Sequence, residues 1–206
     1  MAGASSRPGY FKRYLRYHFR EKAGVLVLGG FFLAGLAVGC ASMDVLTPEA
    51  WSILVEVCGP PPETASFALL LADAFFGMLG LLIFLFLCGF SAVGQFFSAG
   101  AIFVKGAGFG LMASYLYSVS IGAVQWYYIL VVIPKMMMWL AVAIPAARKS
   151  MAMSGSFLSM LLPGNRLEVP LPVGQYLGRF LLLCGGAVAY AFPSSLLELL
   201  YRSVAG

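Results

Sequence analysis

A lysine stands beside a proline in the middle of an apolar run, in the stretch VVIPKMMMWL at residues 131–140. A charged amine is costly to bury, so Lys135 is expected to have an acidic partner. The candidate is Asp73, which lies inside another apolar run. A buried pair of this kind can hold two helices together or form part of an ion or proton path. The alternatives are a neutral lysine, or one whose side chain extends toward water.

Two prolines interrupt the same apolar run. Pro134 has no N–H, so the carbonyl of Leu130 loses its helical partner and becomes an acceptor for Lys135 or a neighbour. Pro145 follows further along. We expect a break at each proline, as in transmembrane helices that line a binding site.

Glycines at a spacing of four residues are the other recurring pattern, and they let helix backbones approach closely within lipid. The pairs are Gly35 with Gly39, Gly106 with Gly110, and Gly174 with Gly178. Asp73 shares a helical face with Gly77 and Gly80, so we expect that face to contact other helices. The pattern predicts a tight bundle or a protein–protein face within the bilayer.

Sequence motifs for catalysis are missing. We find no zinc-protease, serine-hydrolase, phosphate-loop or dinucleotide-binding pattern in a fitting context. The cysteines, Cys40, Cys58, Cys88 and Cys184, lack the spacing of metal ligands. The first two can pair near one membrane face, and the other two are expected to be buried thiols. The sequence therefore predicts no enzymatic activity, no cofactor and no metal.

Composition indicates the elements that must position these residues. The chain has 206 residues, of which 61% are hydrophobic and 10% are charged, and its mean hydropathy is +0.92. A soluble domain carries about 25% charged residues. The formal charge of +5 comes from basic residues crowded near the N-terminus, so it does not indicate nucleic-acid binding. We predict an all-α, polytopic transmembrane helical bundle in the lipid bilayer.

Five apolar stretches have the length of about 20 residues that a membrane span needs. They cover residues 23–43, 67–90, 99–122, 126–147 and 174–198. At about 1.5 Å per residue, Lys135 lies about 14 Å and Asp73 about 10 Å from the same membrane edge, which favours their pairing. Lys105 and Arg179 lie near span ends, where long side chains reach the headgroups.

The basic residues predict the orientation. The segment 1–22 contains six of them before the first span, while the connection 44–66 contains four carboxylates and no lysine or arginine. The segment 148–173 contains Arg148, Lys149 and Arg166. By the positive-inside rule, the N-terminal segment is cytoplasmic. Residues 23–206 then form a single transmembrane domain.

Two stretches resemble a known family. Residues 87–117, LCGFSAVGQFFSAGAIFVKGAGFGLMASYLY, are similar to the core of the stage II sporulation protein M family, and residues 129–154 resemble its next span. Where an amide pair is expected after the first proline, this chain has Lys135 and Met136. The resemblance implies a non-enzymatic scaffold in the mother-cell membrane of an endospore-forming bacterium. Such a scaffold holds peptidoglycan-degrading partners at the septum during engulfment.

The alternative is a transporter or channel component that uses Asp73 and Lys135. Charges at depth and proline-interrupted helices favour it. No inverted repeat is recognisable, and five spans do not divide into equal halves.

Overall fold

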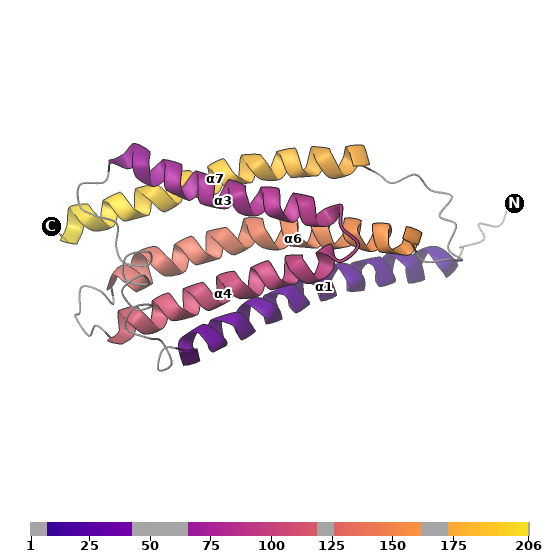
Figure 1. Ribbon diagram of the computed structural model, residues 1–206, viewed down its shortest axis with the longest axis horizontal. Coiled ribbons are helices and arrows are strands. Elements are labelled where there is room, and N and C mark those ends of the chain that lie inside the picture. The colour runs from indigo at the N-terminus through magenta and orange to yellow at the C-terminus, as the bar shows by residue number, and fades with distance from the viewer. Residues whose placement is uncertain (1–7, 43–65, 119–125, 162–172, 206) are drawn as a thin grey trace, which may run out of the picture.

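The computed structural model describes residues 8–42, 66–118, 126–161 and 173–205. Five of its helices are long and apolar enough to cross a membrane. The elements are α1 (Pro8–Ala41), α3 (Phe67–Gly89), α4 (Gly94–Ser118), the π-helical turn η2 (Tyr128–Val132), α6 (Ile133–Leu161) and α7 (Val173–Ala205) (Figure 1). In lipid a helix satisfies its own backbone groups, which is why each apolar run becomes one. The predicted all-α, multi-span fold is confirmed.

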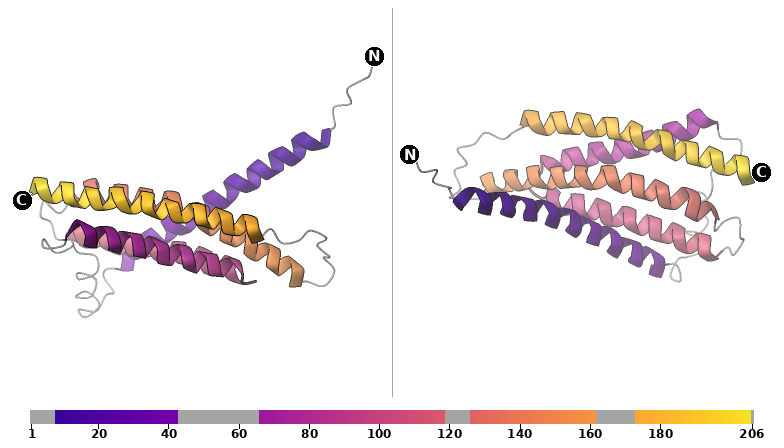
Figure 2. Two further views of the ribbon diagram at one scale, coloured as in Figure 1. Left: turned by 90° about the horizontal axis from the view of Figure 1, so that it is seen from above. Right: turned by 180° about the vertical axis from the view of Figure 1, so that it is seen from behind.

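The helices run roughly along one axis (Figures 1 and 2). We call the end where α7 finishes the C-terminal end of the bundle and the end where α1 begins the N-terminal end. α6 lies in the middle and contacts the other four helices, α1 packs mainly on α4, and α7 packs on α3. Seen from above in Figure 2, the first part of α1 projects beyond the bundle.

The core is built where α6 meets its neighbours. Ala143, Ala146 and Ala147 are fully buried and allow the other helices to approach α6 closely. Phe32 of α1 and Trp139 of α6 lie with their ring centroids 6.4 Å apart within this core. Packing of this kind, with few side chains between backbones, drives helix association in lipid.

The connection between α3 and α4 is a short turn that depends on glycine. A Cβ at Gly94 would lie 1.7 Å from the carbonyl oxygen of Cys88, so no other residue fits there. The other end of α3 is capped by Ser66, whose Oγ accepts a hydrogen bond of 3.3 Å from the N–H of Leu69. These two features fix where α3 begins and ends.

Four helices run past the predicted span limits: α1 begins at Pro8, before residue 23, and α7 ends at Ala205, after residue 198, and α4 and α6 differ as well. The fourth span was expected to end at residue 147, but α6 continues to Leu161. The third span was expected to begin at residue 99, but α4 begins at Gly94. Hydrogen bonds made by the side chains of Ser98, Ser150 and Ser154 join these two extra segments, as described below.

The prolines do not end the helix. The N–H of Ile133 bonds to the carbonyl of Tyr128, five residues earlier, and this π-type turn places Pro134 where no N–H is needed. Pro145 is exposed within α6, which runs through it. At Pro134 the expected break is a π-helical turn, and at Pro145 the helix is continuous. α4 is also continuous.

Candidate functional site

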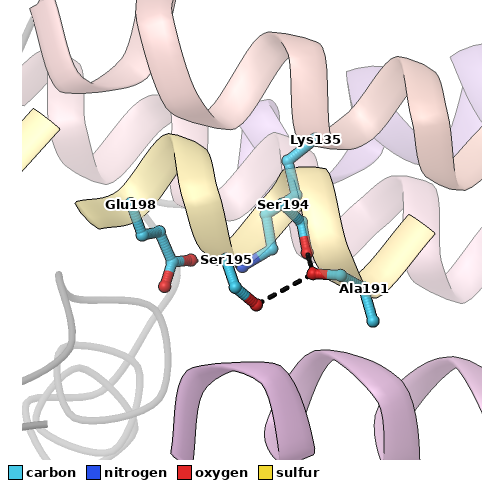
Figure 3. Close-up of polar contacts among 5 residues, drawn as sticks. All are labelled: Lys135, Ala191, Ser194, Ser195 and Glu198. Atoms are coloured by element: carbon cyan, nitrogen blue, oxygen red, sulfur yellow. Dashed lines mark hydrogen bonds and ion pairs between the residues drawn. The ribbon is translucent and has the colours of Figure 1, made fainter. Parts of the chain in front are cut away.

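An ion pair joins α6 to α7 near the C-terminal end of the bundle. The Lys135 Nζ donates to Oε1 of Glu198 (Figure 3). The Glu198 side chain is 7% exposed and that of Lys135 is 28% exposed. Opposite charges in contact offset the cost of removing each from water, so the pair can persist inside a membrane protein.

Each partner of the pair follows a proline. On α6, Lys135 comes directly after Pro134 and the π-helical turn. On α7, Pro193 lies within the helix, one and a half turns before Glu198. Because proline removes a helical hydrogen bond, both helices are locally weakened beside the pair.

Two serines directly after Pro193 bond to the backbone of α7. The hydroxyls of Ser194 and Ser195 both donate to the carbonyl of Ala191, at 2.9 Å and 2.8 Å (Figure 3). Both serines are buried. Their hydroxyls are used by the backbone of their own helix, so the Lys135 ammonium is the partner that the structure gives to the Glu198 carboxylate.

An aromatic layer closes the site toward the C-terminal end. Tyr127 and Tyr201 lie edge to face with their centroids 5.0 Å apart. Val131 and Val132 of the π-helical turn are buried in the same cluster. The ion pair thus lies between this small cluster and the main core, where water is restricted. Chemically, such a pair can lock two helices or exchange a proton when it opens.

The predicted partner of Lys135 is wrong. The ion pair is made with Glu198 and not with Asp73. The Asp73 side chain is exposed, whereas α3 packs on the other helices through buried residues such as Ala74 and Met78. An estimate of depth does not say which face of a helix turns inward.

Two of the predicted glycine pairs lie against each other. A Cβ added at Gly35 would lie 2.1 Å from the carbonyl oxygen of Phe103, and one at Gly39 would lie 2.1 Å from that of Ala107. In return, Gly106 and Gly110 lie against the backbone of α1. The backbones of α1 and α4 therefore touch over two turns, with no room for side chains.

The other glycines face outward. Gly77 and Gly80 on α3 are exposed, with nothing within 4 Å of an added Cβ. The same holds for Gly174 and Gly178 at the start of α7. The expectation that Asp73, Gly77 and Gly80 form a packed face is wrong for the single chain, because α3 uses its other face for packing.

A serine cluster near the N-terminal end of the bundle was missed. Ser98 of α4 and Ser150 of α6 are fully buried and share a hydrogen bond of 2.9 Å. Ser154 accepts from the N–H of Gln95 at 3.1 Å and donates to the carbonyl of Ser91 at 2.6 Å. These bonds hold the turn between α3 and α4 against α6. Buried serines spaced by four residues were the available signal.

Tyr176 ties α7 to the same region. Its hydroxyl donates to the carbonyl of Phe86 at 3.0 Å, and its ring stacks on that of Phe86. A Cβ at Gly89 would lie 2.0 Å from the Tyr176 oxygen, so the glycine makes room for it. The N-terminal end is thus held by side-chain hydrogen bonds from α6 and α7.

The remaining candidates are placed as follows. Lys105 was expected near a span end, but it is exposed about three turns into α4, close to the helix centre. Arg179 is exposed about two turns into α7. Cys40 is a free thiol that donates to the carbonyl of Gly110 at 3.3 Å, Cys88 is buried, and Cys58 lies outside the described residues.

Comparison with models of protein families gave no match, and comparisons with curated proteins and with solved structures gave none either. Among the described residues, no group of three His, Cys, Asp or Glu side chains lies close enough to hold a metal ion.

Glu198 was not singled out from the sequence. It is the last residue of the predicted fifth span, and a carboxylate at that position is typical of the polar end of a helix. Two signals point to it in retrospect: it is the only carboxylate of the span, and a proline and two serines precede it within one turn and a half. Each signal is typical of a polar contact inside a bundle.

Proposed function

We propose that this protein is a non-enzymatic membrane scaffold that holds peptidoglycan-degrading partners at the septal, mother-cell membrane during engulfment. The partners supply the catalysis. The proposal rests on two sets of glycines spaced by four residues. One set brings the backbones of α1 and α4 into contact, whereas nothing lies within 4 Å of a Cβ added at the pair on α7.

The open set is formed by Gly174 and Gly178, with Arg179 exposed beside them. Lipid chains gain little from a glycine pair, whereas a helix backbone of another protein can approach it closely. The start of α7 is therefore the proposed contact for a transmembrane helix of a partner. The resemblance of residues 87–117 to the stage II sporulation protein M family supports the choice of partner.

The experiment is crosslinking in the native host during sporulation, followed by purification through a tag and identification of the proteins recovered. We expect cell-wall hydrolases, and we expect G174L/G178L to reduce their recovery at least tenfold. Recovery of an ATPase or a soluble transport subunit in their place would contradict the scaffold.

A matched control is available on the same helix. Leu182 is 77% exposed, so L182A alters the outer face of α7 without adding bulk. Its recovery of partners should equal that of the natural protein. Equal loss in both variants would show that α7 tolerates no change there, and that the glycines do not form the contact.

One observation favours a transporter or channel component as a second candidate: the Lys135–Glu198 pair between two proline-weakened helices. Asp73 then has no part in the path, because it lies on the outside of α3. Flux through proteoliposomes tests this candidate, with K135M and E198Q as the variants. Flux that disappears in both variants while gel filtration shows each of them folded would support transport, and no flux in the natural protein would reject it.

A further inference from the structure

The first part of α1 continues the membrane span into a basic segment. α1 is one helix from Pro8 to Ala41, and the part that can span the membrane begins at Ala23. Residues 8–22 therefore extend about 22 Å beyond the span, at about 1.5 Å per residue. The view from above in Figure 2 shows this segment leaving the bundle at an angle to the other helices. It contains five lysines and arginines and one carboxylate, Glu21.

The basic residues of this segment share one side of the helix. At about 100° per residue, four of them fall within about 100° of the helix circumference: Lys12, Arg13, Arg16 and Arg20. The other two charges, Glu21 and Lys22, are adjacent and opposite in sign. Phe11, Tyr14 and Leu15 fall on the other side of the helix. A helix with one basic side and one aromatic and apolar side is typical of the membrane interface.

A second basic cluster lies beside the start of this span. A Cβ added at Gly24 would lie 3.7 Å from Cδ of Arg148 on α6, and Lys149 follows Arg148 along the chain. Arg20 precedes Gly24 by four residues, which places it on the same side of α1, about one turn further out. Basic residues of two helices therefore come together at one edge of the bundle.

The depth of these residues matches the layer of lipid headgroups. Arg20 and Arg16 precede the span by about 5 Å and about 10 Å along the helix. The headgroup layer is about 5–8 Å thick on each side of the hydrocarbon core. The attraction of an anionic surface extends about 8 Å further at physiological salt. Both arginines are therefore within reach of lipid phosphates.

We propose that the first part of α1, beside the basic residues of α6, binds the headgroups of anionic phospholipids. The arginines attract the phosphates, and the aromatic side of the segment favours the boundary between headgroups and acyl chains. Anchors of this kind help to set the tilt of a transmembrane helix. The lipid contact therefore helps to fix the angle at which α1 packs on α4. This site is independent of the partner contact proposed on α7.

The test is electron paramagnetic resonance of spin-labelled lipids around the intact chain in phosphatidylcholine bilayers. We expect labelled phosphatidylglycerol to associate at least about fivefold more strongly than labelled phosphatidylcholine, as one lysine or arginine near an anionic surface already contributes about that factor. R16Q and R20Q should each lower this preference, and R16Q/R20Q should lower it further. Raising the salt concentration to 1 M should weaken it as well, because the Debye length falls to about 3 Å.

A control with the same change in charge is available on another helix. K105Q removes an exposed charge from within α4, so it should keep the lipid preference of the natural protein. Gel filtration checks that each variant is folded, and glutamine forms helices about as well as arginine does. Equal association of the two lipids with the natural protein would overturn the proposal, and so would a loss in K105Q equal to that in R16Q. Capture of an acidic protein by this segment, with no preference between the lipids, would overturn it too.

Discussion

Lys135 and Glu198 connect α6 to α7 at the level where each helix is weakened by a proline. On α6 the weak point is the π-helical turn before Pro134, and on α7 it is Pro193 with the two serines after it. The ion pair therefore holds together two helices that have fewer backbone hydrogen bonds of their own. The ion pair is therefore a structural contact between α6 and α7, in addition to any role in proton transfer.

Removing one partner of the Lys135–Glu198 ion pair should destabilise the fold strongly. E198Q leaves the ammonium of Lys135 without its counter-charge, and breaking a buried pair in this way costs about 3–5 kcal/mol. K135M should cost a similar amount. The measurement is the free energy of unfolding in mixed detergent micelles.

The double variant K135M/E198Q distinguishes a pair from two independent side chains. Since no charge is left unpaired, it should cost clearly less than the sum of the single variants, with a coupling of about 0.5–3 kcal/mol. Additive costs would contradict the ion pair.

Any side chain at Gly39 should force α1 away from α4. The added Cβ of G39A would lie 2.1 Å from a backbone oxygen of Ala107, and backbone cannot move aside as a side chain can. Overpacking of this kind costs about 1–3 kcal/mol. Thermal unfolding of the purified protein measures it.

The matched control is G30A on the same helix. Nothing lies within 4 Å of a Cβ at Gly30, and alanine favours a helix by about 1 kcal/mol over glycine. G30A should therefore be neutral or slightly stabilising. Similar losses for G39A and G30A would contradict the close contact between α1 and α4.

Loss of one serine hydroxyl at the N-terminal end should cost more than loss of both. S150A leaves the buried Ser98 hydroxyl without its partner, at a cost of about 1–3 kcal/mol. S98A/S150A removes donor and acceptor together and should recover part of that stability. S203A, at an exposed serine near the end of α7, should have no effect. Unfolding curves of the four proteins test the order.

The termini should lie on opposite sides of the membrane. Five spans are an odd number, and the basic residues of segment 1–22 predict that the N-terminus is cytoplasmic. A protease site added at the C-terminus should be cut in intact spheroplasts, whereas one at the N-terminus should be cut only after lysis. The reverse pattern would contradict the orientation and leave the fold unaffected.

The spans were predictable because they depend on chain length and apolarity alone. The end of α6 was not predictable. Arg148 and Lys149 are typical of the polar end of a span, but the helix continues past them, and Ser150 makes a buried hydrogen bond there. The partner of Lys135 was not predictable either. Asp73 fitted by estimated depth, whereas Glu198 stands at the end of the predicted fifth span, and the pattern of spans does not say which face of each helix turns inward.

The glycine pairs show the same limit. Three glycine pairs spaced by four residues, and Gly77 with Gly80 spaced by three, identified surfaces for close approach that are similar in sequence. Only the packing of α1 on α4 separates the pairs that are used, at Gly35 and Gly106, from those that stay open, at Gly77 and Gly174. Which glycine pairs are in contact depends on the packing of the whole bundle, and the sequence of one helix does not determine it.

The close contact between α1 and α4 also bears on biosynthesis. The last residues of α4 leave the ribosome about 80 residues after the end of α1, which takes about 4–16 s at normal rates of synthesis. During that time α1 is in the membrane without the helix that fits its glycines. The contact of Gly35 and Gly39 with α4 therefore forms only after two further helices have been synthesised.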